Sequence, residues 1–499
     1  MNKSKKNPYE TSLHLRKKTS FAGDVLTLVS GTTFAQILTI LAAPILTRIF
    51  SPEDFGLQAL FLSIAGIISV IACLRYELSI MLPESDDEAA NLLALSLLIT
   101  LIMSVFTVSV IWFGRQPIQN ILKAPQLGTS LWLVPFFVFV NGVFLALNYW
   151  NSRTKNFRRL SLARITSSIA STGTQFGAGF AGYATGESLI GANLVGQSVS
   201  TFILCGQIWK DDKSLFIKRI GWKKMTSGLK RYKKFPLVDS WSALLNTVSW
   251  QLPTFLLAYF FSQSVVGFYS LGFQLLQLPM SFIGSSISQV FFQRASEARF
   301  EGTLAPMVEN VFRLLVVVGM FPILTLTIVG SDVFSVIFGN TWAEAGVYAQ
   351  ILGIWVFIWF ISSPLSTLWI VLEKQEFGFR ITFVNLITRF LSLLIGGLLG
   401  NVYLALFLFA FSGVLVYGYL CLKMVTSSGV DISHIQNIVL QNGILFLPSG
   451  IILVVLKLLG INQLAIVGLS FIFVMTYYLY ILKTDSQINI LFNHFKVPK

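Results

Sequence analysis

Three arginines lie inside long apolar stretches of the chain. They are Arg75, Arg313 and Arg389. A charge within a membrane span usually faces a water-filled cavity or a partner, and the planar guanidinium group binds phosphate through paired hydrogen bonds. The chemistry offered at these positions is therefore recognition of an anion. Arg164 and Arg48 lie at the ends of two further stretches and join the candidate set, although Arg48 can instead extend to the membrane interface.

Some of these arginines could instead form ion pairs with acidic residues nearby in the sequence, which is the alternative to anion binding. Arg313 lies four residues after Glu309, within reach of a local ion pair on one helix face. Arg75 and Glu77 are two positions apart, so on a regular helix they point to different faces and cannot simply neutralise each other. Arg389 has no acidic neighbour in its stretch. We therefore expect Arg75 and Arg389 to face the cavity.

Hydroxyl and amide side chains form lines along four of the stretches, with the spacing of three or four residues that marks one helix face. The lines are Ser270, Gln274, Gln277, Ser281, Ser285 and Ser288; Asp239, Ser242, Asn246 and Ser249; Arg164, Ser168, Ser171 and Gln175; and Thr32, Gln36 and Thr39. Small and hydroxyl residues also favour helix–helix contact, which is the alternative. Full-length lines containing amides favour a water-accessible cavity, so the amide members join the arginines as candidate binding residues. They are Gln36, Asn246, Gln274 and Gln277.

Two carboxylates open apolar stretches, Asp24 and Asp239. An acid at a helix N-terminus complements the helix dipole, and the alternative is a role in coupling transport to an ion. Aromatic side chains close to the polar lines suit the faces of sugar rings. These are Trp241, Trp250, Tyr269 and Tyr149. Together, the arginines, amides, hydroxyls and aromatics describe a site for a large, anionic, hydroxyl-rich ligand.

The histidines and cysteines, which could bind a metal or act in catalysis, are scattered along the sequence. His14, His434 and His494 are isolated, and Cys73, Cys205 and Cys421 have no pairing pattern. We predict no metal site and no catalytic residue. A nucleotide-binding loop of the GxxxxGK type is also missing from the sequence, so direct use of ATP is not expected.

The elements that must position these residues are helices in a membrane. A span needs about 20 mainly apolar residues. Hydrophobic residues make up 54% of the chain and charged residues 12%, against about 25% charged residues in a soluble domain. We predict an all-α polytopic protein with about 14 transmembrane helices. The predicted spans are 21–49, 57–81, 89–113, 129–151, 161–183, 188–209, 237–261, 266–292, 307–329, 346–372, 381–400, 402–424, 442–459 and 464–482.

Basic residues between the spans predict the orientation. Lysines and arginines concentrate in residues 1–20, 152–164 and 210–236, all on one side of the predicted membrane. The other side holds few of them. They are Arg48, Arg115, Lys123 and Lys457. Cytoplasmic loops carry the excess of positive charge, so both termini are predicted to be cytoplasmic. The net charge of +14 then indicates contact with an anionic leaflet, and no nucleic-acid partner is expected.

The basic segment 210–236 is the one long charged break, and the spans on either side of it resemble each other. Each half has a carboxylate at the start of its first span and a glycine, Gly56 or Gly267, at the following outer turn. We predict two six-helix lobes around a central cavity, in parallel orientation, plus two further helices. The predicted parts are a basic N-terminus 1–20, an N-lobe 21–209, a linker 210–236, a C-lobe 237–424, a terminal pair 425–483 and a tail 484–499.

Several motifs resemble those of the polysaccharide flippases, the Wzx-like oligosaccharide translocases of the multidrug/oligosaccharidyl-lipid/polysaccharide (MOP) exporter superfamily. The first outer turn, residues 46–56 (LTRIFSPEDFG), is similar to the family's LTR…P-E-x-F-G turn. Further similar segments are residues 74–77 (LRYE) with 83–89 (PESDDEA), 266–270 (VGFYS) with Leu278-Pro279, and 337–346 (IFGNTWAEAG). The resemblance runs over nearly the whole chain.

This resemblance implies two lobes in a V that alternate between inward and outward openings. The implied cargo is an oligosaccharide on a polyprenyl diphosphate, a repeat unit of O-antigen, capsule or exopolysaccharide, moved across the bacterial cytoplasmic membrane. It also implies a cationic cavity, matching Arg48, Arg75, Arg313 and Arg389, and a terminal helix pair that often forms a groove for the lipid tail. No cofactor is expected, and coupling to a proton or sodium gradient or to the membrane potential stays open. A polysaccharide polymerase and a chain-length regulator are the implied protein partners.

Two other functions remain as alternatives. A cation-coupled drug exporter of the same superfamily is expected to have twelve spans and carboxylates deep in its first lobe. A membrane-embedded polysaccharide polymerase or ligase usually needs a sizeable outer loop with catalytic groups, whereas the longest one here, near 114–128, holds Arg115 and Lys123 without an acid–base pair. We therefore predict a transporter rather than an enzyme.

Overall fold

The computed structural model describes residues 21–484, and the predictions for the N-terminus 1–20 and the tail from 485 lie outside the described residues. Asp24 lies on a described helix, but its side chain is outside the described part. The described residues form helices and connections without a strand, so the prediction of an all-α protein is confirmed.

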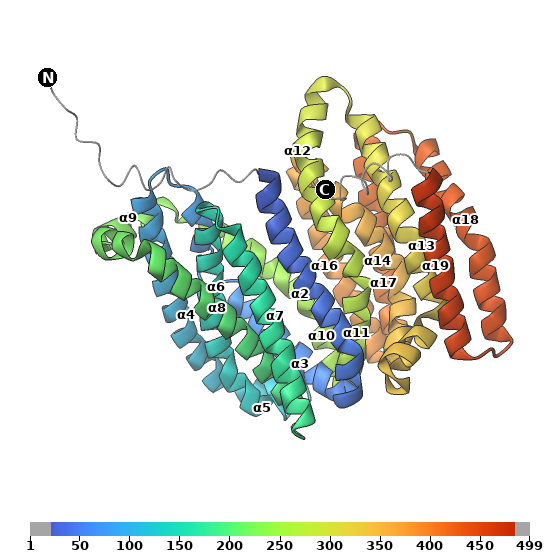
Figure 1. The fold of residues 1–499 in the computed structure, drawn as a ribbon, viewed down its shortest axis with the longest axis horizontal. Coiled ribbons are helices and arrows are strands. Elements are labelled where there is room, and N and C mark those ends of the chain that lie inside the picture. The colour runs from blue at the N-terminus through green and yellow to red at the C-terminus, as the bar shows by residue number, and fades with distance from the viewer. Residues whose placement is uncertain (1–20, 485–499) are drawn as a thin grey trace, which may run out of the picture.

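The helices of the first half are separated by short turns. Their bounds are α2 Phe21–Ile49, α3 Pro52–Ser69, η1 Tyr76–Met81, α4 Asp86–Ile121, α5 Leu127–Ser130, η2 Leu131–Leu133, α6 Val134–Arg153, α7 Phe157–Phe180, α8 Gly186–Arg219 and α9 Trp222–Arg231. We call helices α2 to α8, which occupy the left and centre of Figure 1, the N-lobe. The short helix α9 connects this lobe to the next.

The second half repeats this pattern and adds two helices. Its bounds are η3 Phe235–Asp239, α10 Ser240–Phe260, α11 Gln263–Leu276, η4 Met280–Gly284, α12 Ser285–Glu301, α13 Leu304–Phe338, η5 Asn340–Trp342, α14 Ala343–Leu365, α15 Leu368–Val371, α16 Gln375–Leu398, α17 Val402–Ser427, α18 Ile432–Leu458 and α19 Gln463–Thr484. We call the segments from η3 to α17 the C-lobe. Helices α18 and α19 lie at the edge of the molecule, against α13 (Figure 1).

Ten of the helical segments are long and apolar enough to cross a membrane. Four predicted spans fall on α3, α7, α10 and the α11–α12 segment, which do not meet that criterion within the described residues. These segments carry polar side chains on one face or, in α11–α12, an interruption of the regular helix. The structure therefore establishes a multi-pass membrane protein, and the total of about 14 crossings stays a prediction.

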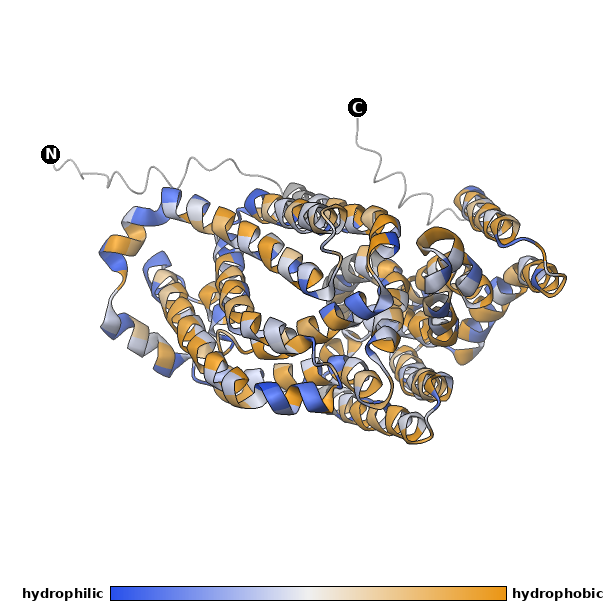
Figure 2. Ribbon diagram, turned by 90° about the horizontal axis from the view of Figure 1, so that it is seen from below, coloured by the Kyte–Doolittle hydropathy of each residue, from blue (hydrophilic) through white to orange (hydrophobic). Residues whose placement is uncertain are grey.

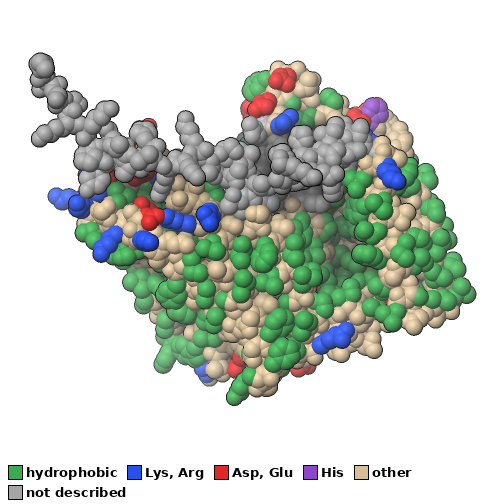
Figure 3. All heavy atoms as spheres, in the orientation of Figure 1, with side chains coloured by type: hydrophobic (Ala, Val, Ile, Leu, Met, Phe, Trp, Pro, Cys, Tyr) green, Lys and Arg blue, Asp and Glu red, His purple; other side chains and the backbone are tan. Residues whose placement is uncertain are grey.

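The surface of the molecule matches a membrane environment. Hydrophobic side chains cover a broad band of the face in Figure 3, and Lys and Arg side chains gather mainly along its upper edge. Figure 2 shows apolar residues along nearly all the helices, with polar residues mainly at helix ends and connections. We call the upper end, where α2 begins and α9 lies, the basic end (Figure 1). The opposite end contains the turns 50–51 and 261–262.

The motif at the first turn of the opposite end works as a helix start. The Ser51 hydroxyl accepts a hydrogen bond from the Asp54 backbone N–H, and the Asp54 carboxylate accepts one from the Ser51 backbone N–H at 2.9 Å. This reciprocal arrangement satisfies N–H groups that have no partner inside the helix. Pro52 occupies the first helical position, where its missing N–H costs nothing. The motif therefore fixes where α3 begins.

Two predicted spans are not continuous helices. The prediction of one helix over 57–81 is wrong, because α3 ends at Ser69 and a turn follows in which Leu74 and Arg75 have φ angles of 48° and 62°. In the predicted span 266–292, a π-helical turn over Met280–Gly284 follows Pro279. Proline lacks a backbone N–H, and a π-helical turn shifts the side chains that follow relative to one helix face. The predicted polar line of the eighth span is thus interrupted.

Candidate functional site

A cavity of about 760 Å³ lies between the lobes. Its N-lobe wall comes from α2, α3, α6, α7 and α8, and its C-lobe wall comes from α11 and the residues that follow it. Amides and hydroxyls from these helices mix with apolar side chains such as Leu62 and Phe137. The cavity therefore combines hydrogen-bonding groups with apolar contact surface.

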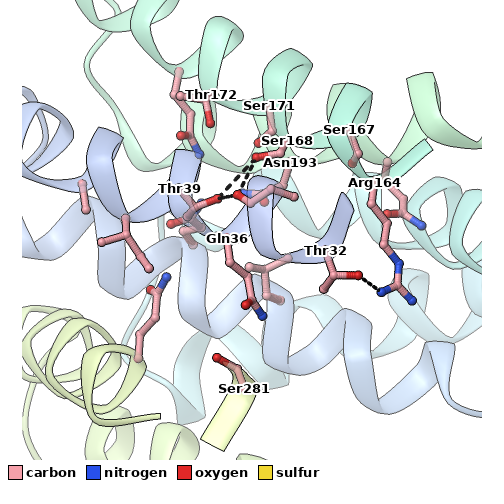
Figure 4. Close-up of a pocket in the computed structure, with 18 of the residues that line it drawn as sticks. Thr32, Gln36, Thr39, Arg164, Ser167, Ser168, Ser171, Thr172, Asn193 and Ser281 are labelled. Carbon is pink, nitrogen blue, oxygen red and sulfur yellow. Dashed lines mark hydrogen bonds between the residues drawn. The ribbon is translucent and has the colours of Figure 1, made fainter. Parts of the chain in front are cut away.

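The polar lines on α2 and α7 face this cavity and also contact each other. All the members of both lines are lining residues. The Ser168 hydroxyl donates to the Ala35 carbonyl at 3.0 Å. It also lies 3.5 Å from the Thr39 hydroxyl (Figure 4). Arg164 donates a hydrogen bond to the Thr32 hydroxyl (Figure 4). Both interpretations of the lines, helix contact and cavity wall, therefore hold for the same two helices.

The opposite wall carries the central part of the α11 line. Gln274, Gln277 and Ser281 line the cavity, whereas the Ser270 hydroxyl donates to the Gly267 carbonyl of its own helix. The expected line over α10 does not reach the cavity. Asn246 is exposed elsewhere, and Ser249 is buried inside the C-lobe.

Further lining residues were not singled out from the sequence. They are Gln58 on α3 and Asn193, Gln197 and Ser200 on α8. The α8 residues follow one another by four and then three positions, which is the same helical signal that identified the other lines. The same argument from helical spacing, applied to α8, would have predicted these residues.

Arg164 is the charged side chain among the described residues that line the cavity. It is partly buried, and it donates a hydrogen bond to the hydroxyl of Thr32 rather than to a carboxylate. A guanidinium has five N–H donors, so a single bond to Thr32 leaves most of its donors for a ligand. The aromatic lining is phenylalanine, as at Phe55, Phe137 and Phe144, and the four tyrosines and tryptophans named from the sequence lie elsewhere.

Arg75 connects the two lobes at the basic end. Its Nε donates to the Asp239 carboxylate at 2.8 Å, and its second ion pair, with Glu77, measures 3.5 Å. The expectation that Arg75 and Glu77 cannot pair is wrong, because neither residue is on a regular helix: Arg75 has a left-handed backbone and Glu77 follows in a 3₁₀ turn. A left-handed conformation costs about 1–2 kcal/mol for a residue other than glycine, so the surrounding structure must hold this turn in place.

Arg389 is buried inside the C-lobe and is not among the residues that line the cavity. Its side chain is 2% exposed, and its guanidinium lies 4.3 Å from the ring centre of Trp250. It donates to the Tyr417 hydroxyl at 3.1 Å and to the Ser249 hydroxyl at 3.4 Å. Aromatic faces attract a guanidinium electrostatically, which replaces the carboxylate that the sequence lacks nearby.

Comparisons with known proteins fit this architecture. The sequence profile of a family described as "Polysaccharide biosynthesis protein" matches residues 45–347. The chain belongs to this family. The matched residues run from the end of α2 into α14, so membership rests on both lobes. No curated protein sequence matches the chain.

Solved structures show the same fold as this member of the polysaccharide biosynthesis family. A lipid II flippase MurJ in an inward closed conformation has a TM-score of 0.70 at 12% identity, covering 92% of this chain and 99% of its own. An inward-facing multidrug resistance MATE family transporter of the MOP superfamily has a TM-score of 0.57 at 13% identity, covering 84% and 98%. A MOP superfamily transporter from Pyrococcus furiosus has a TM-score of 0.53 at 12% identity, covering 82% and 96%. Together with the family match, these structures confirm the resemblance to the MOP superfamily that the sequence motifs indicated.

The remaining candidate residues of this family member are spread over the molecule. Arg48 is exposed at the opposite end, and Arg313 is exposed on α13, outside the lining of the cavity. The Glu309 carboxylate, expected beside Arg313, lies 3.3 Å from His434 Nδ1 on α18. The structure thus gathers Arg164, Gln36, Gln274 and Gln277 at one cavity and leaves the other arginines and Asn246 apart.

The lobes close tightly at the opposite end. A Cβ added at Gly56 would lie 1.9 Å from the Gln263 carbonyl oxygen, and one added at Gly267 would lie 1.9 Å from the Pro52 carbonyl oxygen. The two glycines that mark equivalent places in the halves are therefore where α3 and α11 meet backbone to backbone. The Trp342 indole also donates across to the Thr47 carbonyl at 2.8 Å.

Because Arg389 is buried, we expect its replacement to destabilise the protein. Arg389→Ala is expected to lower the free energy of unfolding by about 3 kcal/mol, because it leaves a cavity and breaks the contacts with Trp250 and Tyr417. Thermal unfolding of the purified protein and its level in the membrane would measure the loss. Arg380→Ala, with a side chain that is 75% exposed on the same helix, should change stability by less than about 0.5 kcal/mol. Equal stability of the two variants would contradict the structural role.

Proposed function

We propose that the protein is a flippase that moves a polyprenyl-diphosphate-linked oligosaccharide across the cytoplasmic membrane by alternating access. The observation that carries the proposal is the cavity between the lobes, where Arg164 stands among amides and hydroxyls. The guanidinium suits a diphosphate, and the amides and hydroxyls suit sugar hydroxyl groups. Membership of a polysaccharide biosynthesis family supports the same cargo.

The lining of the cavity favours this cargo over the drug-exporter alternative. The charged group among the described lining residues is a cation, which repels a cationic drug and attracts an anionic lipid-linked sugar. The polymerase or ligase alternative needs acid–base groups at a reactive centre, and the lining offers amides, hydroxyls and a guanidinium instead. We therefore retain transport as the function, with a polymerase and a chain-length regulator as proposed partners.

Removal of the protein should trap its cargo. We expect cells without it to accumulate lipid-linked oligosaccharide on the cytoplasmic face and to lose the glycan at the surface, because synthesis continues while translocation stops. Extraction of the lipid-linked pool, with a glycan-specific probe at the surface, measures both quantities. Cells complemented with the intact gene provide the control. Loss of surface glycan without accumulation of lipid-linked sugar would point to an enzyme, and normal levels of both would reject the proposal.

The proposed orientation places the basic end, and both termini, in the cytoplasm. Asn340 and Lys224 are exposed, Asn340 at the opposite end and Lys224 on α9. In intact cells, a membrane-impermeant maleimide should label Asn340→Cys and leave Lys224→Cys unlabelled until the membrane is opened. The reverse pattern would overturn the orientation. Coupling to a proton or sodium gradient remains part of the proposal, and Asp239, one of its two candidates, is held in an ion pair with Arg75.

A further inference from the structure

The contacts between the lobes differ between the opposite end and the basic end, and between these ends the Ser63 hydroxyl on α3 donates to the Gln251 side chain on α10 at 3.0 Å. At the opposite end, α3 and α11 meet backbone to backbone at Gly56 and Gly267. At the basic end, Arg75 and Asp239 connect the lobes through side chains that are 26% and 44% exposed. Water and dissolved anions can therefore reach this ion pair, whereas the glycine contact is buried. The ion pair at the basic end is therefore a contact between the lobes for which a dissolved anion can compete.

The geometry of Arg75 suits a stronger anion than the one it holds. One bond, from Nε to Asp239, measures 2.8 Å, and the Glu77 carboxylate stands at 3.5 Å, beyond a normal charge-assisted bond. A guanidinium presents five donors in a fixed fork that matches phosphate oxygens. The strained turn at Leu74 and Arg75 is held by its surroundings, so the fork stays at the boundary between the lobes. Asp239 is the last residue of the π-helical turn η3, an irregular element of a kind that is frequent at functional sites.

We propose that Arg75 is an anion-exchange site, where Asp239 occupies the place of a diphosphate and is displaced when that group arrives. Displacement breaks the ion pair between the lobes at the basic end, which favours separation of the lobes there. A ligand shifts a conformational equilibrium only through different affinities for the two states. Here the difference arises because Arg75 is engaged by Asp239 in the closed state and is available in the open one. The identity of the diphosphate as cargo rests on the proposed function.

Binding of inorganic pyrophosphate to the purified full-length protein tests the exchange. Asp239→Asn removes the competing carboxylate and should tighten binding about tenfold, the value of one charge-assisted hydrogen bond. Arg75→Gln should abolish the binding that Asp239→Asn strengthens. Arg231→Gln is the matched control, since Arg231 at the same end pairs with Glu88 at 2.7 Å without joining the lobes. Unchanged affinity in Asp239→Asn would overturn the proposal, as would retained binding in Arg75→Gln.

The separation of the lobes gives a second readout. Spin labels at Arg158→Cys on α7 and Glu376→Cys on α16, in a background with Cys205→Ala, report the distance across the basic end. Pyrophosphate should increase this distance in the otherwise unchanged protein, and Asp239→Asn should show the larger distance without it. A distance that ignores pyrophosphate would overturn the opening step.

Phosphate groups of membrane lipids offer the same chemistry, and a parallel titration separates the two sources. Phosphatidylglycerol in mixed micelles carries one phosphodiester, so it should open the lobes less than pyrophosphate at equal concentration. An equal response would assign the site to membrane lipid and overturn the diphosphate assignment. These measurements need no transport, so they can fail while surface glycan display still supports the proposed function, and the reverse also holds.

Discussion

Replacement of Arg164 by glutamine is expected to reduce surface glycan at least tenfold while the protein remains in the membrane. Arg164 is the charged group among the described residues that line the cavity. A hydrogen bond between charged partners contributes about 1.5–3 kcal/mol, which corresponds to about 10- to 100-fold in affinity. Glutamine can still bond to Thr32, so the local contact between α2 and α7 is kept. Quantified surface glycan, divided by the membrane level of each variant, measures the effect.

Two further variants sharpen this prediction. Arg158→Gln removes an exposed arginine from the same helix, outside the cavity lining, and should leave display unchanged. Arg164→Lys keeps the charge and loses the paired donors, so its display should lie between those of the glutamine variant and the unchanged protein. If lysine and glutamine behave alike, the geometry of the fork is what matters. If display persists at full level in Arg164→Gln, the cargo anion binds elsewhere.

The cavity wall from α2 and α7 could be predicted from sequence because helical periodicity determines it. Arg164, Ser168, Ser171 and Gln175 must share one face of a helix, and in a membrane such a face must meet water or another polar face. The same argument applied to Asn193 and Gln197 on α8 would have extended the wall. Spacing within one helix is local information, and it therefore survives in the sequence.

Two features of the structure could not be predicted from the sequence because they depend on tertiary contacts: the burial of Arg389 and the turn before Arg75. The aromatic neighbours of Arg389 are Trp250, Trp355 and Phe409, which come from three other helices, so no spacing around Arg389 reveals that it is enclosed. The turn before Arg75 was also hidden. Residues 70–74 (VIACL) are apolar and contain neither glycine nor proline, so they continue the pattern of a helix. The left-handed conformations of Leu74 and Arg75 depend on tertiary contacts, such as the ion pair of Arg75 with Asp239.

Replacement of Gly56 by alanine is expected to abolish transport by preventing closure at the opposite end. The added methyl group would lie 1.9 Å from the Gln263 carbonyl oxygen, less than any non-bonded contact permits, and a backbone atom cannot move aside as a flexible side chain can. Each lobe can still fold, since the conflict is between α3 and α11. The equilibrium should therefore shift towards a state that is open at the opposite end.

Cysteine labelling from outside the cell can detect this shift. Gln274 lines the cavity on α11. A membrane-impermeant maleimide should label Gln274→Cys faster in a protein that also carries Gly56→Ala. Gly191→Ala on α8, where an added Cβ has no heavy atom within 4 Å, should leave both labelling and glycan display unchanged. Normal display with Gly56→Ala would show that transport does not require the backbone contact. Loss of display without faster labelling would instead indicate that the lobes are blocked before the cavity opens outward.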